Sequence, residues 1–173
     1  MLCCTQFGCI SRAMVELKSN ALFTIKKDAR NRGVFDFYQG ESQVSALRIK
    51  CDWCSVNKTP IFKMFDRGDG ALIAKSSVMN GFRLDSVIEI VGHNYRAVKV
   101  KRRLFKRGCY FKLAKKRKCE IVRGDDCFLI KQASKILADY RKDSIKLHLS
   151  QESSLYEKLI ILIVLFMRSV FKQ

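Results

Sequence analysis

The stretch Ser154-Leu-Tyr-Glu-Lys-Leu-Ile-Ile-Leu-Ile-Val-Leu-Phe-Met-Arg168 decides how the rest of the chain must fold. Ser154 and Glu157 have the spacing of a helix capping box, in which the serine hydroxyl accepts from the amide three residues on and the glutamate returns to the cap amide. The nine residues 159–167 are all apolar, and the arginine that follows suits the negative end of a helix dipole. We therefore predict a helix over residues 155–171 that is apolar on every face and must be enclosed by protein or by lipid.

Lipid and a buried strand are the two alternatives to an enclosed helix. A spanning helix needs about 20 apolar residues, whereas this run has nine and charged residues flank it on both sides. A buried strand fits the many β-branched residues, but the capping box favours a helix. A barrel of about twelve strands has an interior wide enough for more than side chains, so a helix enclosed by sheet fits best.

Residues 44–53 show the alternation of a half-buried strand. One face carries the mainly apolar side chains of Leu47, Ile49, Cys51 and Trp53. The other face carries the charged side chains of Arg48, Lys50 and Asp52.

Short strands joined by turns are expected along residues 20–150. The clearest hairpin joins 60–65 to 71–75 across Asp66-Arg-Gly-Asp-Gly70, whose residues tolerate positive φ. The expected strands cover 21–26, 34–38, 44–53, 60–65, 71–75, 86–91, 95–100, 109–113, 119–122, 127–131 and 144–149. The predicted fold is mainly β: a closed barrel of about twelve strands around the C-terminal helix.

The chain has 173 residues and a single proline, so we expect one domain over residues 12–173, preceded by a cysteine-containing segment at 1–11. The first ten residues have neither the basic region nor the apolar run of a secretory signal. We therefore expect the eight cysteines to be reduced and the protein to be cytoplasmic.

The order of hairpins, last strand and apolar helix resembles the tubby C-terminal-like superfamily, which includes tubby domains, phospholipid scramblases and LURP-one-related proteins. The matching features are the hairpin Asp66–Gly70 with 71–75, and the ending Asp143-Ser-Ile-Lys-Leu-His-Leu-Ser-Gln-Glu-Ser-Ser-Leu-Tyr-Glu-Lys-Leu-Ile-Ile-Leu-Ile-Val-Leu165. The likeness covers about residues 12–171 and is nearest to the LURP-one-related branch.

This resemblance implies a twelve-stranded barrel around a central hydrophobic helix. It also implies phosphoinositide binding, which tubby domains perform through basic residues, although no local motif carries those positions onto this chain. Scramblases have an acylated cysteine cluster before the domain, and Cys3, Cys4 and Cys9 are similar to it. Acylation there, together with a polybasic surface, would give reversible membrane attachment.

The charge balance gives the strongest indication of function. The chain has 34 Lys and Arg against 16 Asp and Glu, a net charge of +18, which attracts polyanions. The densest segment, 99–118, holds the predicted anion-binding residues Lys99, Lys101, Arg102, Arg103, Lys106, Arg107, Lys112, Lys115, Lys116, Arg117 and Lys118. If 99–107 and 112–118 flank a turn near Gly108, these cations converge on one side of the barrel.

The other motifs give little support for metal binding or catalysis. Cys51-Asp-Trp-Cys54 has half the spacing of a zinc knuckle, but no second such pair accompanies it, so we expect no metal and no cofactor. No phosphate-binding loop or nucleophile motif is present, so we expect no enzyme and no small-molecule substrate. The sequence predicts a non-enzymatic module that binds anionic membrane lipid at the periphery of a membrane. A nucleic-acid-binding barrel, or a protein-interaction barrel with an incidental basic surface, is the alternative.

Overall fold

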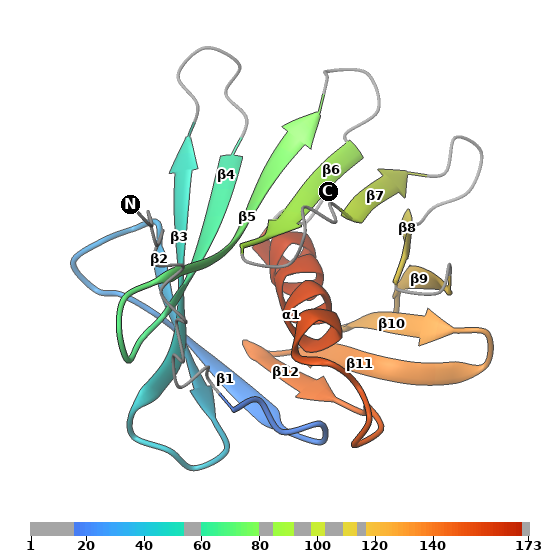
Figure 1. The fold of residues 1–173 in the computed structure, drawn as a ribbon, viewed down its shortest axis with the longest axis horizontal. Helices are drawn as coiled ribbons and strands as arrows, with labels where there is room; N and C mark the ends of the chain where they lie inside the picture. The colour runs from blue at the N-terminus through green and yellow to red at the C-terminus, as the bar shows by residue number, and fades with distance from the viewer. Residues whose placement is uncertain are drawn as a thin grey trace, which may run out of the picture.

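The protein is a barrel of twelve strands that encloses one helix (Figure 1). The computed structural model describes residues 16–53, 60–79, 85–91, 98–102, 109–113 and 117–170. The strands are β1 (Leu22–Lys27), β2 (Val34–Gln39), β3 (Ser45–Trp53), β4 (Pro60–Asp66), β5 (Leu72–Met79), β6 (Asp85–Ile90), β7 (Val98–Arg102), β8 (Cys109–Lys112), β9 (Lys118–Arg123), β10 (Phe128–Gln132), β11 (Lys135–Arg141) and β12 (Ser144–Leu147). The helix is α1 (Leu155–Val170).

Each strand pairs antiparallel with the next, and β1 closes the ring by pairing with β12. In this closing pair Phe23 lies opposite Ile145, and both side chains are fully buried. Just beyond β12, the Leu149 amide donates to the Ser19 carbonyl at 3.1 Å, which continues the contact past the strand ends. A closed ring leaves no unpaired sheet edge. The predicted fold class, a mainly β barrel with a C-terminal helix, is confirmed.

The helix begins where the capping pattern predicts. Ser154 Oγ accepts from the Glu157 amide at 3.2 Å, which satisfies one of the free donors of the first turn. The other half of the predicted capping box differs, because the Glu157 carboxylate contacts Arg117. Within the described residues, no helix combines the length and the apolar character that crossing a bilayer requires.

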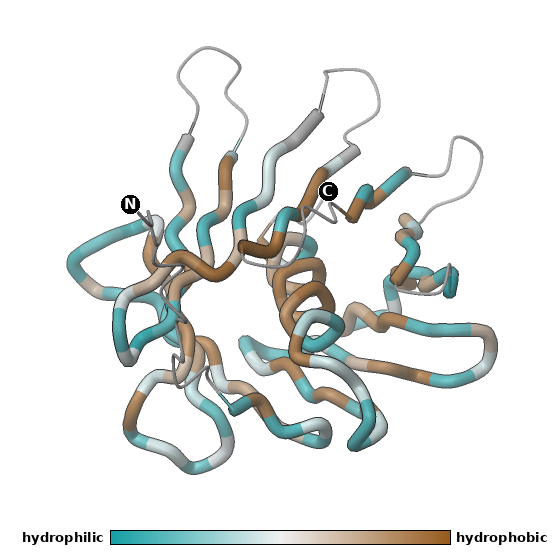
Figure 2. The backbone as a smooth tube through the Cα atoms, viewed as in Figure 1, coloured by the Kyte–Doolittle hydropathy of each residue, from teal (hydrophilic) through white to brown (hydrophobic). Residues whose placement is uncertain are grey.

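The strands surround α1 on all sides. Residues 159–167 are buried around the whole circumference of the helix, which contacts β6, β10, β11 and β12. Figure 2 shows this apolar helix enclosed by strands whose colour alternates between hydrophobic and hydrophilic residues. Burial of so many aliphatic side chains is the main stabilising contribution of the helix, at about 1.5–3 kcal/mol for each one fully buried.

Phe166 fixes the position of α1 relative to the opposite wall. Its ring lies 4.9 Å from Phe35 and 5.4 Å from Phe37 on β2, and 5.8 Å from Phe62 on β4, all edge to face. This is the geometry that aromatic quadrupoles favour. The helix therefore contacts strands on both sides of the ring, as the enclosed-helix prediction requires.

The hairpin predicted at Asp66–Gly70 is present. Asp66 Oδ1 accepts from the Gly68 amide at 2.6 Å, the Asp66 amide donates to the Ala71 carbonyl at 2.9 Å, and Gly70 has a φ of 72°. A positive φ is sterically cheap for glycine, which explains the residue at that position. On β3 the predicted alternation is also confirmed, since Leu47 and Ile49 are buried.

One strand was not predicted. The sequence pattern indicates no strand between residues 132 and 143, but β11 occupies Lys135–Arg141 and pairs with both β10 and β12. Its register with β10 shifts between Ile130 and Lys131. This irregularity buries the consecutive residues Leu137 and Ala138, which breaks the two-residue period that identifies a strand from sequence.

Candidate anionic-ligand surface

Four lysines share the outer face of β7, β8 and β9, because successive residues of a strand point to opposite sides of the barrel wall. The inward-facing, buried residues are Val98, Val100, Cys109, Phe111, Cys119 and Ile121. The alternate positions carry the exposed lysines Lys99, Lys101, Lys112 and Lys118. We call these four residues the lysine face.

The strand register brings the lysine face together. β7 and β8 pair antiparallel with Lys101 opposite Tyr110 and Arg102 opposite Cys109. Continued by two residues, this register sets Lys99 level with Lys112. The turn near Gly108 itself lies outside the described residues. Lys112 lies directly opposite Lys118 across β8 and β9. Like charges in this position repel each other and destabilise the pairing of the two strands.

The lysine face holds few compensating acids. Lys118 Nζ lies 3.3 Å from Glu120 Oε1 and 5.1 Å from the centre of the Tyr110 ring. Within the described part of the chain, no acidic side chain forms an ion pair with Lys99, Lys101 or Lys112. The field of these ammonium groups is therefore open to an anion in solution.

Arg117 has a different environment from the neighbouring lysines. It lies in the connection between β8 and β9, and its Nη2 donates to Oε1 of Glu157 in the first turn of α1. Glu157 is a buried residue, so this contact compensates a carboxylate that is largely removed from water. Arg117 thus links the β8–β9 connection to the enclosed helix.

The remaining predicted site residues are placed only in part. Arg102 is the last residue of β7, next to the lysine face in the chain. The residues that lie outside the described ranges are Arg103, Lys106, Arg107, Lys115, Lys116 and the predicted acylation sites Cys3, Cys4 and Cys9.

A second group of cations was not predicted. The connection from β1 to β2 carries Arg30 and Arg32. The Ile25 amide donates to the Asp143 carbonyl at 2.8 Å, which brings the turn between β11 and β12 alongside the second half of β1. That turn contributes Lys142. The only signal in the sequence is the local run Lys26-Lys-Asp-Ala-Arg-Asn-Arg32, because the partner turn is remote in the chain.

Among the described cysteines, which are all free thiols, Cys109 and Cys119 are buried and Cys51 and Cys127 are partly buried. Burial raises the pKa of Cys51 and raises that of Cys119 to about 11, which keeps both protonated near neutral pH. Cys54, the partner of Cys51 in the zinc-knuckle spacing, lies outside the described residues. Among the residues that are described, no three His, Cys, Asp or Glu side chains gather closely enough to hold a metal ion.

Asp139 and His148 form a polar pair on the outer wall that sequence analysis did not identify. His148 Nε2 lies 2.7 Å from Asp139 Oδ2, and Arg141 Nε lies 3.5 Å from Asp139 Oδ1. An acid–base dyad of this type needs a nucleophile on the other side of the imidazole. Within the described ranges, no serine or cysteine hydrogen-bonds to His148. The contact with Asp139 links β11 to the residue after β12.

Comparison of the chain with protein-family models, with curated proteins and with solved structures found no match.

Proposed function

We propose that this protein is a non-enzymatic binding module that holds anionic membrane lipid, of the phosphoinositide headgroup type, on the lysine face of β7–β9. The observation that carries the proposal is the cross-strand pair of Lys112 and Lys118. Folding alone does not favour two ammonium groups in register, whereas a phosphate bound between them would turn the repulsion into attraction.

The enclosed helix supports an outer rather than an inner ligand site. Side chains of α1 such as Phe166 occupy the barrel interior and contact opposite walls. A ligand therefore meets the outer faces of the strands, where the cations lie. Each cation near an anionic bilayer contributes about 1 kcal/mol of binding free energy, so the four lysines together contribute about 4 kcal/mol.

Aliphatic residues beside the lysine face favour a bilayer over nucleic acid. Val122 on β9 is exposed and lies directly opposite Leu129 on β10. Such side chains gain from contact with the acyl–headgroup boundary of a membrane. Binding of single-stranded nucleic acid would instead use aromatic stacking platforms, and Tyr110 is the one aromatic residue among the described outward positions of β7–β9.

The resemblance to the tubby C-terminal-like superfamily is also part of this proposal. Twelve strands in consecutive order and an enclosed C-terminal helix support it. Peripheral membrane attachment in the cytoplasm, helped by acylation at Cys3, Cys4 or Cys9, follows from the proposal and has its own test, which is palmitate labelling of the protein and of its Cys→Ser variants.

Vesicle co-sedimentation tests the lysine face. The assay uses phosphatidylcholine vesicles, alone and with phosphatidylinositol bisphosphate or phosphatidylserine at equal surface charge. We expect binding to the anionic vesicles only, and stronger binding to the phosphoinositide. The triple variant K99Q/K101Q/K112Q should bind on the order of 100-fold more weakly, since it loses three cations worth about 1 kcal/mol each.

The matched control is K18Q/K135Q/K146Q, which removes three exposed lysines from other parts of the barrel. The proposal fails if this control weakens binding as much as the lysine-face variant does. It also fails if duplex DNA, at the same salt concentration, binds tightly while the vesicles do not.

A further inference from the structure

We infer that the barrel has a second anion-binding surface on the side opposite the lysine face, and that it can therefore bridge two anionic membranes. The second surface consists of Lys27, Arg30, Arg32 and Lys142, which we call the hairpin-tip surface. The bridging inference rests on the proposed function of the lysine face and adds a second, independent contact to it.

The hairpin-tip surface is assembled from two turns. Lys27 ends β1, Arg30 and Arg32 lie in the connection to β2, and Lys142 lies in the turn between β11 and β12. The hydrogen bond from the Ile25 amide to the Asp143 carbonyl, 2.8 Å long, holds the turn between β11 and β12 against β1, two residues before Lys27. All four side chains are exposed.

The longer turn is rigid enough to present its arginines. Asp28 Oδ1 accepts from the Arg30 amide at 2.8 Å and from the Asn31 amide at 3.1 Å. The Asp28 amide donates to the Val34 carbonyl at 2.9 Å, which closes the turn. Because these bonds already order the backbone, less entropy is lost when a ligand binds the arginines.

The cations of this surface have few internal partners. Asp28 is the acid nearest to them in the chain, and its carboxylate is engaged by the two backbone amides of the turn and lies 4.0 Å from Arg48. Within the described residues, no ion pair involves Lys27, Arg30, Arg32 or Lys142. Guanidinium groups bind phosphate oxygens in a bidentate manner, which suits lipid headgroups.

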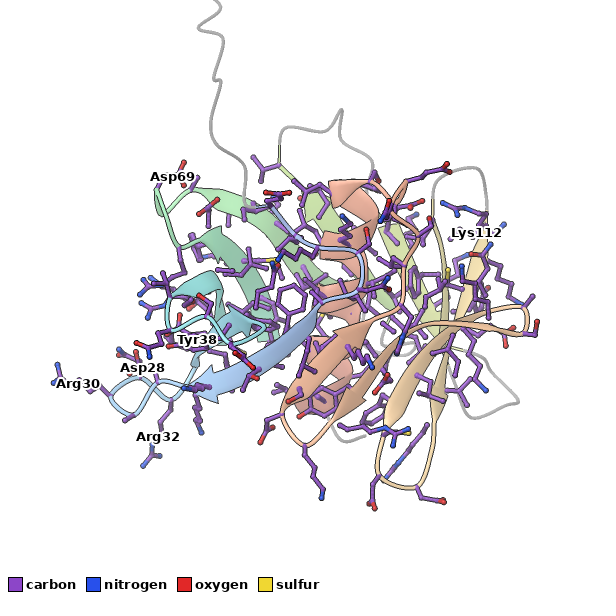
Figure 3. The ribbon with its side chains drawn as sticks, turned by 90° about the horizontal axis from the view of Figure 1, so that it is seen from below. Asp28, Arg30, Arg32, Tyr38, Asp69 and Lys112 are labelled. Carbon is purple, nitrogen blue, oxygen red and sulfur yellow. The ribbon has the colours of Figure 1, made fainter. Side chains whose placement is uncertain are left out.

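The two surfaces point in opposite directions. Five strands separate β2 from β8 in either direction around the closed ring, so the outer faces of these two strands are opposed. Figure 3 shows Arg30 and Arg32 at one extreme of the molecule and Lys112 near the other. A single flat membrane cannot contact both surfaces at once. A protein bound through the lysine face must therefore present the hairpin-tip surface to the solution.

A second membrane fits this surface better than nucleic acid does. Tyr38 lies on the outer face of β2 with Lys26 Nζ 4.7 Å from its ring centre, and Leu22 on β1 is exposed. Tyrosine and a lysine stem are amphipathic groups of the kind that settle at the boundary between headgroups and acyl chains.

The test combines a binding measurement with a bridging measurement on the same vesicles. Vesicles with phosphatidylserine, or with phosphatidylinositol bisphosphate at equal charge, carry either a donor or an acceptor dye. Co-sedimentation gives the bound protein, while dynamic light scattering and energy transfer between vesicles report bridging. We expect the wild-type protein to bridge vesicles, and bridging to fall again when excess protein saturates both surfaces.

The variant R30Q/R32Q/K142Q separates the two surfaces. We expect the lysine face to be the tighter of the two surfaces and to set the vesicle affinity, so this variant should change vesicle binding by less than about twofold. It should reduce bridging at least about tenfold, because only one surface remains. The control K18Q/K135Q/K146Q should bind and bridge like the wild type, and all proteins should have closely similar melting temperatures.

Three results would overturn the inference: wild-type protein that binds without bridging, equal bridging by the hairpin-tip variant and the control, or duplex DNA recruited to protein-coated vesicles in place of a second vesicle. In the first two cases the proposed function survives. Failure of the wild-type protein to bind anionic vesicles would instead remove the proposed function itself.

Discussion

Arg117, in the connection between β8 and β9, donates to the carboxylate of Glu157 in the first turn of the enclosed helix. The arginine is partly exposed, whereas the glutamate is buried. The contact therefore joins the edge of the basic segment to the centre of the barrel. It also compensates a charge that would otherwise be removed from water without a partner.

We expect Arg117→Gln to lower the free energy of unfolding by about 1–3 kcal/mol, because it leaves the Glu157 carboxylate without its cation. Glu157→Gln on the same background should recover part of this loss, since it removes the uncompensated charge. Chemical denaturation of the wild type, both single variants and the double variant measures the coupling. Additive effects of the two substitutions would contradict the pairing.

The fold was largely predictable because residues close together in the sequence of α1 indicate both the helix and its need to be enclosed. A capping serine followed by nine apolar residues indicates a helix that must be enclosed, and the alternation on β3 indicates the wall that encloses it. The strand β11 was missed for a physical reason. It follows a turn in which Ala133 has a φ of 52°, a conformation unusual for alanine, and the shifted register hides its alternation.

The candidate site was predictable only where its residues are close in the chain. The lysine face lies within residues 99–118, so the density of positive charge was enough to find it. The hairpin-tip surface combines Arg32 with Lys142, which come from the two ends of the chain and share one side of the barrel only because β1 pairs with β12. Conversely, Arg117 looked equivalent to Lys118 in the sequence, and only the tertiary contact with Glu157 distinguishes the two.

Ile161→Asp should prevent folding. Ile161 is fully buried in the middle of α1, and a carboxylate there would have no water and no partner. We expect loss of the β-sheet signal in circular dichroism, or an insoluble product. The control Val170→Asp lies at the end of the same helix with 39% of its surface exposed and should fold. A folded, membrane-released Ile161→Asp protein would argue against the enclosed helix.

Gly33→Ala should destabilise the protein by about 1–3 kcal/mol through overpacking. A Cβ at this position would lie 2.6 Å from the Cys51 carbonyl oxygen, and that backbone is held by the bond from the Cys51 amide to the Gly33 carbonyl. Thermal melting measures the effect. Gly68→Ala is the comparison, because its nearest contact is a side-chain oxygen of Asp66 at 3.2 Å, so its loss should be smaller.

Acid should lower the folding stability of the protein, partly through protonation of Asp36. Arg48 donates Nε to Oδ1 at 2.8 Å and Nη2 to Oδ2 at 2.7 Å, and this pairing lowers the pKa of Asp36 below its ordinary value. A lowered folded-state pKa adds stability above the unfolded value, near 4, and this stability is lost as the pH falls through the folded value. Asp36→Asn should be less stable than the wild type at neutral pH, and the difference should shrink below about pH 4. A constant difference from neutral pH to acid would contradict this assignment.

Lys112→Glu should raise the free energy of unfolding and, at the same time, weaken binding to anionic vesicles. The substitution replaces the repulsion between Lys112 and Lys118 by an attraction across β8 and β9, a gain of about 0.2–1 kcal/mol in the free energy of unfolding. It also puts a carboxylate on the lysine face, so binding to anionic vesicles should weaken about tenfold or more. Lys146→Glu makes the same charge change opposite Asp139, where it should destabilise the protein and leave the lysine face intact. Opposite signs for stability and binding in Lys112→Glu would indicate that the lysine pair is kept for a ligand, whereas unchanged binding would show that its charge is incidental.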